Sequence, residues 1–253
     1  MSADRVLVEL IIAAPIDRVW DALRNRHQIS QWFGWDYPGA DDEHGFIAGL
    51  PSETDGAARI IRAVGVPDRY VVEAYDDQHT IVRVIRSAPV TDASWTGIYD
   101  DVFEGWTTFT HQLRFLIERM PQGVRRTLFL NGRARAAGEA PPLEALGLGA
   151  LRTASVGDKY SVTTAAGDTL TGEIYFRSVY QLGITVKEFG DGILIAATRS
   201  TTAKSPHGGG TLLLATYGLS DQAYAELHAR WAAWWKRSFE VIDVQPKGIH
   251  EGA

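Results

Sequence analysis

The residues of this sequence with the clearest capacity for binding are its aromatic rings. The 253-residue chain contains eight tryptophans, nine tyrosines and nine phenylalanines. Rings spaced along a helix commonly pack in a core, but a concave surface lined by rings with a few polar groups also holds small apolar molecules. We therefore predict a ligand cavity in the first half of the chain. Its expected lining is Trp32, Phe33, Trp106, Phe109 and Leu113, with Thr110 as a polar contact.

Acidic and basic groups near the same stretch leave catalysis open as an alternative. They are Tyr99, Asp100, Asp101, Glu104 and His111. General acid–base catalysis requires such groups to converge on one point, and their spacing does not bring them together. His111 lies beside the apolar stripe of a predicted helix and is expected in solvent. His228 lies on the stripe of a second helix and is expected in the core. Binding without catalysis is the favoured interpretation.

Several other classes of site are disfavoured by composition and motifs. The chain has no cysteine, which excludes disulfides and thiolate metal sites. No two of its seven histidines have the four-residue spacing of a helical metal site. Residues 147–152 (GLGALR) lack the third glycine of a dinucleotide fingerprint, and residues 208–211 (GGGT) lack the lysine of a phosphate loop. We expect no metal and no cofactor.

The charge distribution argues against a nucleic-acid partner. The formal net charge is -6, and residues 1–120 hold 11 Lys and Arg against 19 Asp and Glu. Phosphate contacts need a clustered positive surface instead. Apolar runs also stay shorter than the roughly 20 residues of a membrane span. A cytoplasmic protein without a membrane span is expected.

Elements that would position the aromatic residues follow from hydrophobic periodicity. The first half is expected to contain a strand, two helices, a loop over 35–52 with a short edge strand at 45–48, three strands, and a long helix from about Val102 to Met120. The first strand is expected at 6–12, the helices at 16–23 and 28–33, and the later strands at 57–64, 69–75 and 80–86. Residues 95–101 are either a last strand or the approach to the long helix.

The second half repeats the plan of a sheet followed by a long helix. We expect a domain over 1–120, a linker over 121–142, and a second domain over 143–253. That domain is predicted to hold a helical turn, strands at 159–164, 170–177, 180–187, 193–198 and 211–217, and a helix that Ser220 caps. Trp234 stands off the apolar stripe of this helix, and an exposed tryptophan there would favour an interaction surface or a homodimer.

Two motifs in the first half resemble a known family. Residues 12–23 (IAAPIDRVWDAL) with 31–34 (QWFG), and residues 103–109 (FEGWTTF) leading into Gln112 and Leu113, resemble homologues of the activator of heat-shock-protein-ninety ATPase. The resemblance implies the SRPBCC superfamily, also called START-like, with a helix-grip fold. In that fold a curved antiparallel sheet wraps around a long C-terminal helix, with a hydrophobic cavity between them. Members bind lipids, sterols, polyketides or plant hormones, and some are polyketide aromatases or cyclases.

These observations together predict an α+β protein. A helix-grip domain is expected first, followed by a second, incomplete helix-grip-like half. The expected function is binding or transport of a small hydrophobic or aromatic molecule without a cofactor. The alternatives are a cofactor-independent enzyme resembling polyketide cyclases and aromatases, and a chaperone-associated interaction module. The fold alone does not choose among them.

Overall fold

The computed structural model describes residues 4–64, 67–87, 96–203 and 205–243, with the side chains of 96–102 excepted. It has the α+β architecture expected, with two antiparallel sheets. The described residues divide into two compact units, the first ending at Met120 and the second beginning at Pro121.

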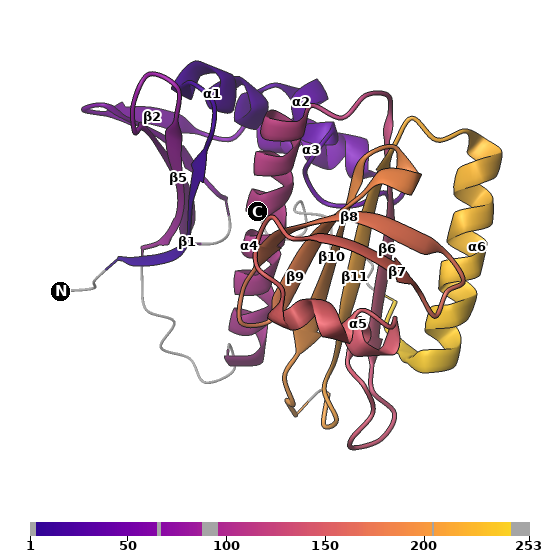
Figure 1. Ribbon diagram of the computed structural model, residues 1–253. Helices are drawn as coiled ribbons and strands as arrows, with labels where there is room; N and C mark the ends of the chain where they lie inside the picture. The colour runs from indigo at the N-terminus through magenta and orange to yellow at the C-terminus, as the bar shows by residue number, and fades with distance from the viewer. Residues whose placement is uncertain (1–3, 65–66, 88–95, 204, 244–253) are drawn as a thin grey trace. The chain divides into compact units, whose positions relative to one another are not determined.

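The first unit is a five-stranded antiparallel sheet with three short helices and one long one (Figure 1). The strand order is β1-β5-β4-β3-β2. Its elements are β1 (Arg5–Ile12), α1 (Ile16–Arg24), α2 (Arg26–Ser30), α3 (Ala40–Ala48), β2 (Ser52–Asp55), β3 (Ala58–Arg62), β4 (Asp68–Ala74), β5 (Thr80–Arg86) and α4 (Thr96–Arg119).

Alternation along the strands turns one face of this sheet toward α4. In β5 every second side chain is buried, and Val82 and Val84 join Tyr70 and Val72 of β4 in one apolar core. Leu113, Leu116 and Ile117 of α4 enter the same core. Because strand side chains alternate with period two, this shared face produces the helix-grip arrangement.

Residues 35–52 differ from the expected loop, because Ala40–Ala48 is the helix α3 and no edge strand forms at 45–48. Its first turn carries Asp41, Asp42 and Glu43, and negative charges there stabilise the positive end of the helix dipole. Gly39 supplies the left-handed conformation, φ 99°, that precedes the helix. Glycine and aspartate thus begin a helix here instead of a turn. Helix α4 also begins earlier than expected, at Thr96.

Helix α4 is buried on more sides than its amphipathic pattern predicts. Thr107, Gln112 and Phe115 lie off the stripe that faces the sheet, yet all three are buried. His111 was expected in solvent and is only 7% exposed. The prediction of an exposed His111 is therefore wrong, because local periodicity shows one apolar face and not every neighbour of a helix.

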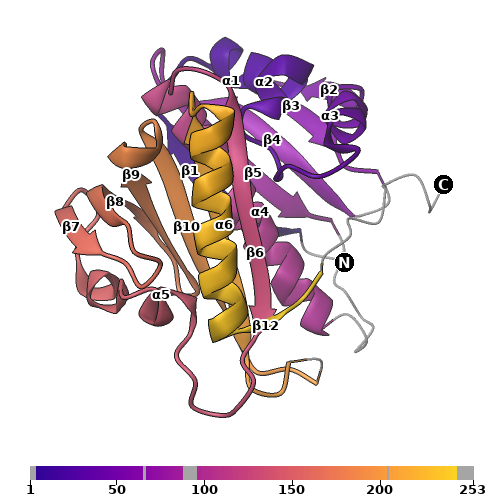
Figure 2. The same ribbon diagram turned by 90° about the vertical axis from the view of Figure 1, so that its right-hand side faces the viewer.

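The second unit is a seven-stranded sheet in the order β12-β6-β11-β10-β9-β8-β7. Figure 2 shows the long helix α6 running beside β6. The elements are β6 (Arg125–Arg133), α5 (Pro142–Ala145), η2 (Gly149–Thr153), β7 (Lys159–Thr163), β8 (Thr169–Arg177), β9 (Gln181–Val186), η3 (Lys187–Phe189), β10 (Gly192–Arg199), β11 (Gly209–Tyr217), α6 (Asp221–Ser238) and β12 (Glu240–Val241).

Strand β6 corrects the expected linker over 121–142. It pairs antiparallel with β11 from Arg125↔Tyr217 to Arg133↔Gly209. The sequence did not predict this strand because its arginines are typical of a solvated linker. In the structure, Arg126 pairs with Asp221 and Arg133 pairs with Glu240. The second unit therefore opens with a strand, and its plan is more complete than expected.

Helix α6 begins as predicted, because the Ser220 side chain accepts a hydrogen bond from the Ala223 N–H. Two predictions about which side chains of α6 face the core are wrong. Trp234 is only 4% exposed and packs edge-on against Trp231 and Trp235, whereas His228 is exposed. Leu227, Trp231, Trp234, Trp235 and Phe239 form one core with the sheet, so the apolar stripe is broader than expected and passes His228 by.

Candidate functional site

The structure divides the six predicted ligand-binding residues into a buried group and a partly open one. Trp32, Thr110 and Leu113 are almost completely buried. The Trp32 indole N–H donates to the Ala22 carbonyl at 2.9 Å, which fixes the ring between α1 and α2 as core. Phe33, Trp106 and Phe109 are partly buried and pack against the core that the sheet shares with α4.

Partly buried rings form a row, which we call the ring row: Phe33, Phe109, Trp35 and Tyr37. Phe33 lies 4.7 Å from Phe109 between ring centroids, and Phe109 lies 6.4 Å from Trp35. Trp35 is in turn 6.4 Å from Tyr37. Centroid separations of this size are typical of interacting aromatic pairs. Rings from the segment after α2 therefore meet a ring of α4.

Trp106 is held by a buried ion pair that sequence reasoning missed. Asp68 at the start of β4 is the register partner of Arg86 at the end of β5. Arg86 Nε and Nη2 donate to the two carboxylate oxygens of Asp68, each at 2.7 Å, and both side chains are buried. The Trp106 indole N–H donates to Asp68 Oδ2 at 2.8 Å. A bidentate pair of this kind fixes geometry as well as charge, so it orients the Trp106 ring.

Tyr70 completes this corner of the first unit. Its ring lies 5.3 Å from the Trp106 ring at an interplanar angle of 90°. The side chain is only 7% exposed, and among the residues that the structure describes its hydroxyl has no hydrogen-bond partner. Burial raises the pKa of Tyr70 well above its ordinary value, so the phenol keeps its proton.

Thr110 lies close enough to affect that pKa, by favouring the phenolate. To favour the phenolate, the Thr110 hydroxyl would have to donate a hydrogen bond to the Tyr70 oxygen. The Thr110 hydroxyl instead donates to the Trp106 carbonyl at 2.7 Å. Thr110 is therefore a neighbour of Tyr70 and not a hydrogen-bond donor to it, and among the described residues the Tyr70 hydroxyl has no hydrogen-bond partner.

The expected acid and base groups are not brought together by the residues that the structure describes. The side chains of Tyr99, Asp100 and Asp101 lie outside them. Glu104 is partly buried on α4. Burial, with the nearby Arg114 charge, lowers the pKa of His111 to about 3, so this imidazole is neutral near pH 7.

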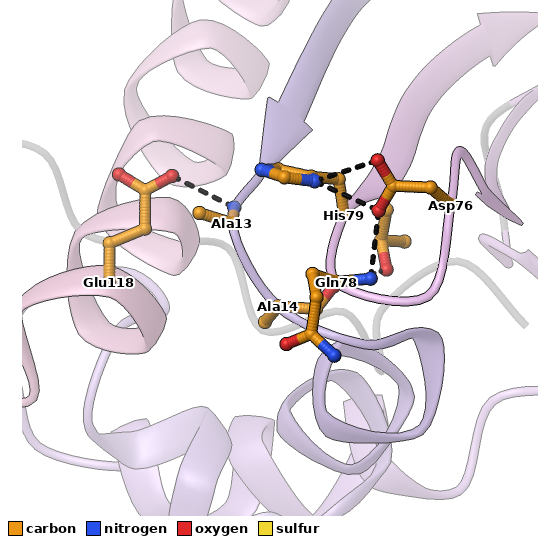
Figure 3. Close-up of polar contacts among 7 residues, drawn as sticks. Ala13, Ala14, Asp76, Gln78, His79 and Glu118 are labelled. Carbon is orange, nitrogen blue, oxygen red and sulfur yellow. Dashed lines mark hydrogen bonds and ion pairs between the residues drawn. The ribbon is translucent and has the colours of Figure 1, made fainter.

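A second polar cluster lies at the turn between β4 and β5 (Figure 3). His79 Nδ1 lies 2.9 Å and 3.0 Å from the two oxygens of Asp76, which also accepts from the Gln78 N–H at 2.8 Å. In Figure 3 the imidazole lies beside Ala13, whose N–H donates to Glu118 of α4 at 3.1 Å. These bonds shape the turn and tie the end of β1 to α4, so we assign this cluster a structural role.

In the second unit, the tryptophans of the long helix α6 are held in the core and are not partly open. Asp168, before β8, accepts from the Trp231 indole N–H and from Arg230 Nη2, both at 2.7 Å. The Trp235 indole N–H donates to the Asn131 carbonyl. Trp231, Trp234 and Trp235 are all buried. A carboxylate thus holds an indole of the long helix in each unit, but the held indole is partly buried in the first unit and completely buried in the second.

Neither a metal site nor a membrane helix is found in the described part of the chain. There, no group of three or more His, Asp or Glu side chains is arranged to hold a metal ion. In the same residues, no helix combines the length and apolar character needed to cross a membrane.

The sequence matches no protein-family model and no curated protein. Among solved structures it is similar to DynU16, of the dynemicin biosynthetic locus, at 18% identity over 91% of this chain and 94% of that chain, with a TM-score of 0.25.

Two di-domain ARO/CYC proteins give comparable values. BexL, from the BE-7585A biosynthetic pathway, is 11% identical over 94% of this chain and 93% of its own, with a TM-score of 0.30. StfQ, from the steffimycin biosynthetic pathway, is 13% identical over 93% and 96%, with a TM-score of 0.28. Similarity at these TM-scores supports no inference about function, and the family resemblance of residues 12–23 and 103–109 stays a resemblance.

Proposed function

We propose that the first unit binds a small apolar molecule that contains a ring, between its sheet and α4. The observation that carries the proposal is the ring row, which stays partly open while the three tryptophans of α6 are buried. Rings that are partly exposed beside an apolar core offer stacking and edge contacts to a planar ligand.

The order of side chains along α4 supports this position. Trp106, Phe109 and Leu113 follow each other at steps of three and four residues, so they share one helix face. Trp106 is fixed by Asp68, Leu113 is part of the core, and Phe109 between them contacts Phe33 and Trp35. Phe109 is therefore the ring we expect a ligand to contact first.

The proposal is limited to binding. A cyclase or aromatase activity would also need an acid and a base at the rings. His111, one of the candidate acid and base groups, is buried, and its pKa of about 3 makes it a weak base near pH 7. Nothing in the described side chains favours catalysis over binding. A homodimer through the second unit stays a prediction, and Trp234 does not support it because it is buried.

Calorimetric titration with 2-ethylnaphthalene tests the proposal. We expect saturable binding that weakens about three- to tenfold in Phe109→Leu, because an aromatic contact contributes about 0.5–1.5 kcal/mol beyond its area. Leucine keeps an apolar side chain at the position, so the core should survive. Tyr75→Leu is the matched control, because Tyr75 is an exposed ring of the same unit.

Equal affinity in the wild type and Phe109→Leu, with both melting at the same temperature, would reject this site. An absence of any saturable binding to the wild type would reject the function itself.

A further inference from the structure

The buried hydroxyl of Tyr70 makes no hydrogen bond to the described residues of the first unit. The Tyr70 side chain is more than nine-tenths buried, and within the described part of the chain its hydroxyl has no hydrogen-bond partner. Leaving a polar group buried and unpaired costs about 1–3 kcal/mol. Phenylalanine would pack the same ring against Trp106 without that cost, so the hydroxyl calls for a partner that the described residues do not supply.

The hydrogen-bonding atoms around Tyr70 determine what that partner must be. The Trp106 N–H is donated to Asp68, and the Thr110 hydroxyl proton to the Trp106 carbonyl. Of these three donors, the Tyr70 hydroxyl is the one that makes no hydrogen bond to the described residues. Because its pKa is raised, it stays a donor across the physiological range. The missing partner is an acceptor.

We infer that the ligand of the first unit carries a carbonyl oxygen next to its ring system and that Tyr70 donates a hydrogen bond to it. This inference rests on the proposed function and specifies its ligand class. Tyr70 contacts Trp106, and Trp106 lies one helical turn from Phe109. A planar ring placed against Phe109 thus brings an attached carbonyl to the Tyr70 side of α4. The ion pair Asp68–Arg86 is a positioning element, because it holds Trp106 and through it the Tyr70 ring.

Two probes of matched shape test the inference in the full chain. In 2-acetylnaphthalene a carbonyl replaces a methylene group of 2-ethylnaphthalene. The informative quantity is the ratio of their two dissociation constants in each variant, because the ratio cancels differences in solubility and packing. We expect Tyr70→Phe to lower the preference for the ketone about three- to tenfold, the usual effect of one hydrogen bond, and to leave the affinity for 2-ethylnaphthalene within about twofold.

Tyr160→Phe is the matched control, because the Tyr160 hydroxyl of the second unit donates to the Thr185 carbonyl. It should lower the melting temperature and leave both affinities unchanged. Tyr70→Phe should not lower the melting temperature, since its hydroxyl has no partner to lose.

The outcomes separate the two claims. If neither probe binds the wild type, the proposed function fails. If both bind and Tyr70→Phe leaves their ratio unchanged, binding stands but the inference is wrong, and water satisfies the hydroxyl. A loss of thermal stability in Tyr70→Phe equal to that in Tyr160→Phe would also overturn it, because the hydroxyl would then be paired within the chain.

Discussion

At the scale of single residues, Asp68 organises the candidate site. Its two oxygens accept from Arg86 and Trp106, and its side chain is completely buried. Burying a charge is tolerable only where it is paired and hydrogen-bonded. The pair lies in the interior, where removal of either partner of a buried ion pair is strongly destabilising. This makes Asp68 more sensitive to substitution than the exposed ion pairs of the same sheet.

Asp68→Asn should lower the free energy of unfolding by about 3 kcal/mol, because the buried Arg86 guanidinium loses the charged partner of its bidentate pair. Chemical denaturation with urea measures this loss. The double variant Asp68→Leu with Arg86→Met should lose less than the single one, since it removes both charges. Glu53→Gln is the control: its exposed pair with Arg62 should contribute less than about 1 kcal/mol. A double variant less stable than Asp68→Asn would contradict this account.

At the scale of elements, both long helices pack against their sheets, but α6 fills its sheet more completely than α4 does. Helix α6 fills its sheet with Trp231, Trp234 and Trp235, and Arg135 donates to carbonyls at its C-terminal end. Helix α4 contributes smaller core residues and contains a glycine, Gly105, one residue before Trp106. We connect the open ring row with this lighter packing of α4.

Two glycines give opposite predictions for replacement by alanine. At Gly105 an added Cβ would meet nothing within 4 Å, so Gly105→Ala should stabilise α4 by about 1 kcal/mol through helix propensity. At Gly132 in β6 it would lie 2.8 Å from Phe239 Cβ, so Gly132→Ala should destabilise by about 1–3 kcal/mol. Thermal unfolding of both variants measures the signs. A stabilised Gly132→Ala would show that β6 does not pack against the C-terminal end of α6 as described.

At the scale of the whole molecule, two units share the plan of an antiparallel sheet and a long helix, and our proposal gives the ligand to one of them. Hydrogen exchange with 2-acetylnaphthalene present and absent tests this division. Binding should slow exchange in β4 and α4, because a ligand stabilises the state that holds it. Exchange in the amides of α6 should change little, since its rings are already buried. Equal protection of α4 and α6 would contradict an assignment to the first unit.

The sequence by itself determined most elements, because period-two and period-3.6 patterns are local. The strands at Thr80–Arg86 and Lys159–Thr163 and the Ser220 cap agree with expectation to within about a residue. Two of the exceptions, α3 and β6, are segments where charged residues obscured the pattern.

Only the tertiary structure decided which side chains matter for the site. Asp68 and Arg86 meet through strand register, and the described residues place no hydrogen-bond acceptor at the Tyr70 hydroxyl. Burial of Trp234 and His111 likewise depends on more than the stripe of one helix. Periodicity shows which face of an element is apolar. Which groups meet there is set by residues distant in the chain, and that pairing leaves no local pattern.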